Sequence, residues 1–259
     1  MTGLLDVLLR WMHILVGILW IGHLYFFNFV NGPLQGKLDG PTKKLVNPEL
    51  MPRALYWFRW GAAWTWITGV LLLMLVFYHG RAVLNGGEFT TATWIMIAVT
   101  FLAVFAYDAI MSSGIAADQK KANIVAGAIG AAIVLGYVFV GRFSARGTLI
   151  HTGAMFGTIM AFNVWFRIWP AQQKIIRAVK EGTPPDANLV KMAGLRSRHN
   201  TYLSVPLFFA MINQHASILY GGNFGLGANT YWIAWFVIIA LGWHIVWQLY
   251  KKAGQVQGF

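Results

Sequence analysis

The sequence predicts an all-α fold, a polytopic transmembrane helix bundle of about seven spans with the N-terminus outside and the C-terminus inside. Three observations support this prediction. The 259 residues are 58% hydrophobic and only 11% charged, a composition typical of a membrane protein. Apolar segments of about 20 residues, the length needed to cross a bilayer, recur along the chain. The basic residues gather in alternate loops, which sets the orientation.

The predicted spans follow one another with little chain between them. They are residues 4–29, 54–78, 92–112, 123–140, 148–169, 201–220 and 229–249. No linker separates two folded parts. We therefore expect a single transmembrane domain over residues 1–259.

Three segments between or within the spans have a distinctive composition. Residues 170–200 predict a short cytoplasmic amphipathic helix and a loop. The basic segment 171–181 places Ile175, Ile176 and Val179 on one side of a helix, and Gly182 and two prolines then end it. The loop at residues 32–52 is rich in glycine and proline, and we expect packing alone to order it. The small residues at 126–132 predict close packing of the fourth span against a neighbouring helix.

The charge distribution predicts the topology. Of the 20 Lys and Arg residues, 16 fall on one side of the predicted bundle and 4 on the other. The positive-inside rule makes the richer side cytoplasmic. The net charge of +12 is then a topology signal that suits anionic lipid, and no nucleic-acid partner is expected. We expect a multi-pass protein of the bacterial inner membrane.

The absence of cysteine limits the chemistry of the sequence. The 259 residues contain no cysteine, which excludes disulfides, cysteine-ligated clusters and a covalently attached c-type haem within them. The His-Glu-x-x-His pattern of zinc proteases is absent, and the eight acidic residues are too scattered for a carboxylate metal site.

Most of the seven histidines lie in or at the ends of predicted spans. An ionisable side chain in lipid is costly and usually faces a bundle interior, a cavity or a bound group. The helical rise places each histidine by depth. An outer cluster then contains His13, His151 and His215, with His79 at its margin. An inner cluster contains His23 and His244, with His199 at its margin.

The two histidine clusters predict haem binding. Neutral imidazole is a ready ligand of haem iron, and each cluster draws on different helices, as two axial ligands facing each other across a porphyrin require. We expect one or two b-type haems. His13 with His215 or His151 would ligate the outer iron, and His23 with His244 the inner iron. The alternative is that these histidines are packing residues that make hydrogen bonds.

Four further residues near the clusters are candidates for supporting roles. Gly17 lies one turn after His13 and leaves room for a flat ring. Arg142 at the outer mouth can hold haem propionates, and its alternative is a solvated loop arginine. Asp108 and His199 are candidates for a proton relay from the inner side, and the alternative for Asp108 is a structural ion pair.

Several segments resemble one known family. They are residues 9–22 (LRWMHILVGILWIG), 150–164 (IHTGAMFGTIMAFNV), 170–174 (PAQQK), 196–206 (RSRHNTYLSVP) and 211–215 (MINQH). They resemble the N-terminal membrane domain of bacterial membrane-bound urate oxidases (urate hydroxylases). The resemblance covers His13, His151, His199, His215 and His244, whereas His23 and His79 match no family position.

The resemblance implies a polytopic membrane domain that serves a c-type cytochrome as electron acceptor. In the family this cytochrome is fused at the C-terminus. The chain has no c-type haem motif, so we expect the cytochrome, or another redox partner, to be a separate subunit.

Three functions stay open at this point. The first is a b-type haem protein that passes electrons between quinone, or a periplasmic redox partner, and another subunit. The second is an oxidoreductase that oxidises urate or a related purine with an external cytochrome c as acceptor. The third is a non-redox transporter or metal-handling membrane protein.

Overall fold

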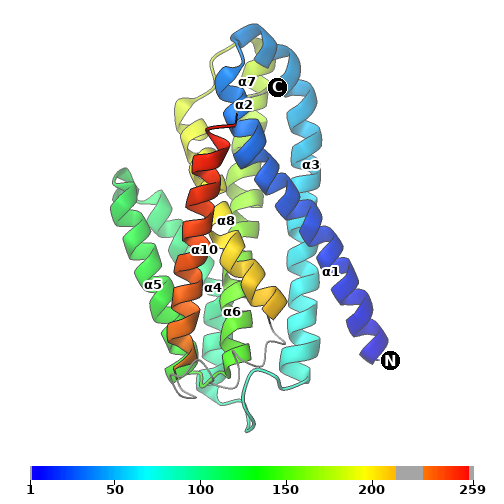
Figure 1. Ribbon diagram of the computed structural model, residues 1–259, viewed down its shortest axis with the longest axis vertical. Helices are drawn as coiled ribbons and strands as arrows, with labels where there is room; N and C mark the ends of the chain where they lie inside the picture. The colour runs from blue at the N-terminus through cyan, green and yellow to red at the C-terminus, as the bar shows by residue number, and fades with distance from the viewer. Residues whose placement is uncertain (1, 214–229, 257–259) are drawn as a thin grey trace. The chain divides into compact units, whose positions relative to one another are not determined.

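The computed structural model describes residues 2–213 and 230–256, and the regular elements in these ranges are helices. Figure 1 labels most of them. In chain order they are α1 (Thr2–Tyr25), η1 (Phe26–Asn31), α2 (Gly32–Lys37), α3 (Gly40–Leu72), η2 (Leu73–His79), α4 (Thr91–Ser112), η3 (Gly114–Ala117), α5 (Gln119–Phe139), α6 (Ala145–Phe162), η4 (Asn163–Ile168), α7 (Trp169–Glu181), α8 (Ala187–Ile212) and α10 (Tyr231–Ala253). The segments η1, η2 and η4 are π-helical, and η3 is a 3₁₀ turn.

The helices confirm an all-α, multi-pass membrane protein. Within the described residues, six helical runs are long and apolar enough to cross a bilayer. They are Gly3–Lys37, Gly40–His79, Thr91–Ser112, Gln119–Phe139, Ala145–Glu181 and Tyr231–Ala253. The predicted span at 201–220 begins in α8, and its residues 214–220 lie outside the described residues. The orientation of the N-terminus stays a prediction.

The prediction of a loop at residues 32–52 is wrong. The segment is helical in α2 and again from Gly40 onward. Asp39 caps the start of α3, because its Oδ1 accepts a hydrogen bond from the Thr42 backbone N–H at 2.8 Å. Hydrogen bonds from the Thr42 side chain and from its backbone N–H hold the pKa of Asp39 below its usual range. Pro41 then occupies the first turn, where its missing N–H costs nothing.

The loop predicted around residues 170–200 is also mostly helical. The fifth span continues through η4 into α7 without a break, and α8 begins at Ala187. The amphipathic helix and its end are confirmed. Gly182 has a φ of 76°, the left-handed conformation that glycine adopts at helix C-termini.

The chain forms two compact units, each with its own core. The first contains residues 1–69, 160–205 and 242–259, and the second contains residues 70–159 and 206–241. In the first unit α1 crosses α3 at Gly61, where an added Cβ would lie 2.9 Å from the Trp20 backbone nitrogen. The Trp20 side chain is 1% exposed at this crossing. Close backbone contact at a small residue is the usual way for helices to associate in lipid.

In the second unit α4 lies beside α5 (Figure 1). The hydroxyls of Thr100 and Tyr137 are 2.9 Å apart across this interface, and a Cβ on Gly136 would lie 2.7 Å from Met96 Cε. Close packing therefore occurs at Gly136. The expectation for residues 126–132 is not met, because a Cβ on Gly127 or Gly130 would meet nothing within 4 Å.

Candidate functional site

His13 on α1 is held by α3 through its Nδ1 atom. This atom lies 3.0 Å from the Thr68 hydroxyl oxygen. The Thr68 hydroxyl donates its own hydrogen to the Trp64 carbonyl at 2.7 Å. The shorter contact favours donation to the carbonyl, and the hydroxyl then accepts from His13, with the ring proton on Nδ1. The lone pair of the neutral imidazole is then on Nε2.

Glycine makes room for the His13 ring, at a position that the sequence did not single out. A Cβ on Gly69 would lie 3.1 Å from His13 Cε1, so the ring packs directly on the α3 backbone. A Cβ on Gly17 would meet Thr65 Cγ2 at 3.9 Å, an ordinary contact. The role of Gly17 in receiving a flat prosthetic group stays a prediction.

The two histidines of the predicted inner site also have defined Nδ1 atoms. The half-buried His23 donates from Nδ1 to the Leu19 carbonyl at 2.7 Å. His244 is exposed, and the Gln248 amide nitrogen lies 3.2 Å from its Nε2, which must accept. The described contacts include no hydrogen bond or ring contact between His23 and His244, and their pairing stays a prediction.

His151 lies in the second unit, in α6, with no exposed surface. Its Nδ1 donates to the Gly147 carbonyl at 2.8 Å. The Tyr78 hydroxyl lies 3.1 Å from Nε2 and must donate to it. The ring of Phe143 packs at a centroid distance of 4.7 Å. His151 is thus a fully hydrogen-bonded imidazole within an aromatic surround.

The four imidazoles share one tautomer, with the proton on Nδ1 and the lone pair on Nε2. Histidines that ligate metals through Nε2 usually have Nδ1–H donating to a backbone carbonyl or another oxygen. His13 and His23 fit this arrangement best, because no described side chain donates to their Nε2. His151 and His244 would first have to give up Tyr78 and Gln248.

The remaining predicted residues have varied environments. His215 lies outside the described residues. Arg142 is exposed in the loop after α5, with a φ of 53°. Asp108 in α4 is 9% exposed, and His199 in α8 is half-buried. Among the described residues, no group of three or more His, Asp and Glu side chains could hold a metal ion.

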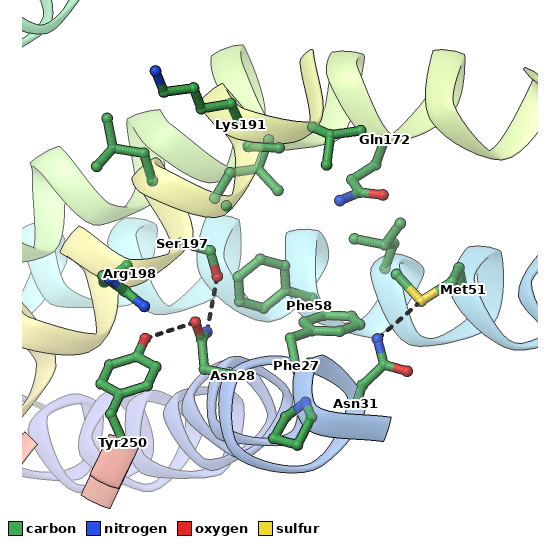
Figure 2. A pocket seen from close by; sticks show the side chains of 18 of the residues that line it. Phe27, Asn28, Asn31, Met51, Phe58, Gln172, Lys191, Ser197, Arg198 and Tyr250 are labelled. Carbon is green, nitrogen blue, oxygen red and sulfur yellow. Dashed lines mark hydrogen bonds between the residues drawn. The ribbon is translucent and has the colours of Figure 1, made fainter. Parts of the chain in front are cut away.

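The first unit contains a cavity that the sequence did not predict. It has a volume of about 610 Å³, within the range of small-molecule sites. Its walls come from η1, α2, α3, η4, α7, α8 and the end of α10 (Figure 2). The Phe27 and Phe58 rings pack edge to face across it at 5.3 Å.

A chain of hydrogen bonds fixes one wall of this cavity (Figure 2). The Tyr250 hydroxyl donates to Asn28 Oδ1 at 2.7 Å. Asn28 Nδ2 donates to the Ser197 hydroxyl oxygen at 2.8 Å. These three residues join η1, α8 and α10, which are far apart in the sequence. Their separation explains why no local motif could reveal the cavity.

The comparison with known proteins identifies the family. Residues 36–257 match the family described as Urate oxidase N-terminal. The chain belongs to the urate oxidase N-terminal family. Neither a curated protein nor a solved structure matches the chain. The matched residues begin after α1, so they include His151 but neither His13 nor His23.

Within this family member, the matched region contains a buried polar network on η4 and α8. Asn163 Nδ2 donates to Asn200 Oδ1 at 2.9 Å, and Asn200 Nδ2 donates to the Met160 carbonyl at 3.0 Å. Arg196, only 1% exposed, lies 3.4 Å from Asn163 Oδ1. Asn163 and Arg196 belong to two of the five segments whose sequences carry the resemblance. Their burial gives those segments a structural role in fixing helix register.

Proposed function

We propose that this family member is a membrane-embedded electron-transfer protein that holds b-type haem through histidine Nε2 atoms. The supporting observation is the shared tautomer of His13, His23, His151 and His244. Each of these imidazoles directs a lone pair from Nε2, and His13 and His23 keep theirs clear of any described side-chain donor. Within apolar helices an Nε2 lone pair without a donor costs free energy unless a bound group coordinates it.

The residues around His13 have defined tasks in this proposal. Thr68 accepts from Nδ1 and so fixes the tautomer and the ring orientation. Gly69 lets the ring lie against α3. The outer ligands would be His13 with His215 or His151, and the inner ligands His23 with His244. Haem iron, when bound, exchanges single electrons between its ferric and ferrous states.

We further propose that a cytochrome c, or another redox partner, exchanges electrons with this membrane domain. Membership of the urate oxidase N-terminal family favours such a partner. Quinone in the bilayer is the other candidate. We also propose a location in the bacterial inner membrane, which the apolar spans and the charge distribution favour.

Difference spectra of histidine variants test the proposal. His13→Ala and His23→Ala should each lower the b-type absorbance per protein by about half if two haems bind, and one of them should abolish it if one binds. His79→Ala is the matched control, because His79 is exposed at the end of η2. Full absorbance in both His13 and His23 variants would contradict the proposal.

A second candidate function is oxidation of urate or a related purine, with an external cytochrome c as electron acceptor. The family match favours it. Purified protein supplied with urate and ferric cytochrome c should then consume urate and reduce two cytochromes per urate. An absence of urate consumption in protein with its full haem content would leave the electron-transfer function alone.

A further inference from the structure

The cavity of the first unit has features that the proposed electron transfer does not use. Figure 2 shows polar side chains on its walls and aromatic rings in its interior. Asn31 is only 6% exposed. Among the described residues, its Nδ2 finds only the Met51 thioether as an acceptor, at 3.6 Å. A thioether is a weak acceptor, so a buried amide donor here lacks a good partner and favours a ligand oxygen.

Two more donors face the same cavity. No hydrogen bond reaches the Gln172 amide from the described part of the chain, and this side chain lines the cavity from α7. The Ser197 hydroxyl accepts from Asn28 and keeps its own hydrogen. Three donors from three helices therefore converge on one space, and they call for a ligand rich in oxygen acceptors.

The charges at the cavity are positive. Lys191 and Arg198 lie among the lining residues, and no described lining residue is acidic or a histidine. Arg198 rests over the Tyr250 ring at 5.1 Å from its centroid. The cavity therefore favours an anion.

The other walls are apolar. Phe27, Leu55, Phe58, Ile168 and Val190 line the cavity. The positive-inside rule puts its lysine and arginine on the cytoplasmic side of the membrane. The cytoplasmic leaflet contains anionic phospholipid. Such a lipid combines an anionic, oxygen-rich headgroup with apolar acyl chains, which matches the two kinds of wall.

We propose that this cavity binds the phosphate headgroup of one anionic phospholipid from the cytoplasmic leaflet. Lys191 and Arg198 attract the phosphate, and Ser197, Gln172 and Asn31 donate to its oxygens and to those of the glycerol. The apolar walls take the start of the acyl chains. Lipid binding at this site does not depend on haem, so it can be tested independently of the proposed electron transfer.

Native mass spectrometry of delipidated full-length protein tests this site. We expect one phosphatidylglycerol per chain, and weaker binding of the zwitterionic phosphatidylcholine. Lys191→Gln and Arg198→Gln should each weaken phosphatidylglycerol binding about fivefold, the loss for one cation near a membrane surface. Lys174→Gln, an exposed cation of α7 outside the cavity, is the charge control and should change binding by less than about twofold.

A steric variant gives an independent readout. Gly194 lines the cavity, and a Cβ there would meet nothing within 4 Å, so Gly194→Leu fills space without a clash at Cβ. It should abolish stoichiometric phosphatidylglycerol binding. Gly127→Leu, at an equally open helix position in α5, should leave it unchanged. The melting temperature of each variant checks its folding.

Four results would overturn the proposal. They are equal binding of phosphatidylcholine, an equal loss in Lys174→Gln and Lys191→Gln, unchanged binding in Gly194→Leu, and displacement of the lipid by millimolar inorganic phosphate. The last result would identify a site for free phosphate instead of a lipid headgroup.

Discussion

At the scale of single residues, the tautomer of each imidazole follows from the chemistry of its neighbours. Backbone carbonyls hold Nδ1 of His23 and His151, and a committed hydroxyl holds Nδ1 of His13. Carbonyls can only accept, so the ring proton is fixed at Nδ1. The direction of each Nε2 lone pair is thereby set before any ligand binds.

The Thr68→Val substitution tests the anchoring of His13. Valine keeps the shape but removes the hydroxyl, and the His13 ring keeps its hydrogen bond to the Thr65 backbone, so the cost is that of one hydrogen bond, about 0.5–1.5 kcal/mol. We expect a lower melting temperature and less haem per protein. Thr65→Val on the same helix is the matched control, because the Thr65 hydroxyl donates only to its own helix, at Gly61 O. Equal effects of the two substitutions would contradict the anchoring role.

The Tyr78→Phe substitution tests whether His151 Nε2 serves a haem or only the phenol. Removal of the hydroxyl should destabilise the protein by about 0.5–1.5 kcal/mol, the value of one hydrogen bond. If His151 is an outer ligand, haem content should not fall, because a competitor for Nε2 is gone. The measurement is Soret absorbance per protein, with His151→Ala beside it. A fall in haem equal to that of His151→Ala would show that the phenol is itself needed for haem binding.

At the scale of elements, the contacts between helices determine which glycines are needed for packing. Gly61 in α3 contacts the Trp20 backbone, which cannot shift cheaply. Gly127 in α5 faces open space. Both glycines lie in apolar spans and are alike in sequence context. The structure nevertheless predicts opposite effects on stability when each is replaced by a larger residue.

Alanine at these two positions should change stability in opposite directions. Gly61→Ala forces a backbone contact of 2.9 Å and should destabilise by about 1–3 kcal/mol, as overpacking does. Gly127→Ala should be neutral or stabilise by up to about 1 kcal/mol, because alanine favours a helix. Thermal unfolding in one detergent measures both. A Gly61→Ala protein as stable as the wild type would contradict the close crossing of α1 and α3.

The spans and the C-terminal break of α7 could be predicted, because length, hydropathy and a glycine followed by prolines are local properties of the sequence. The start of α3 could not be predicted, because a Gly-Pro pair usually indicates a loop. Here Asp39 accepts a hydrogen bond from the Thr42 backbone N–H and caps a helix that begins at this pair. The partners of the histidines were also beyond reach. Thr68 is 55 residues from His13, and only helix rotation decides that they meet.

The cavity was hidden for the same reason. Asn28, Ser197 and Tyr250 are ordinary polar residues in three distant segments, and nothing near any of them signals a site. Burial of Asn163 is indicated by its position inside the predicted span at 148–169, whereas Arg196 lies in the predicted loop around 170–200, where nothing local indicates burial.

At the scale of the whole molecule, the charge asymmetry fixes the predicted topology. A chain without cysteine allows a direct test, since a single introduced cysteine has no background. Asn85→Cys, exposed between η2 and α4, should react with an impermeant maleimide in intact cells. Thr183→Cys, exposed between α7 and α8, should react only after lysis. The reverse pattern would invert the topology and the assignment of outer and inner histidines.

The most direct test of the central claim is a pyridine haemochrome spectrum of the purified protein, with iron measured on the same sample. The proposed histidine ligation predicts a b-type spectrum with one or two irons per chain. Protein that is folded and membrane-extracted, yet shows no haemochrome band and no iron, would contradict it.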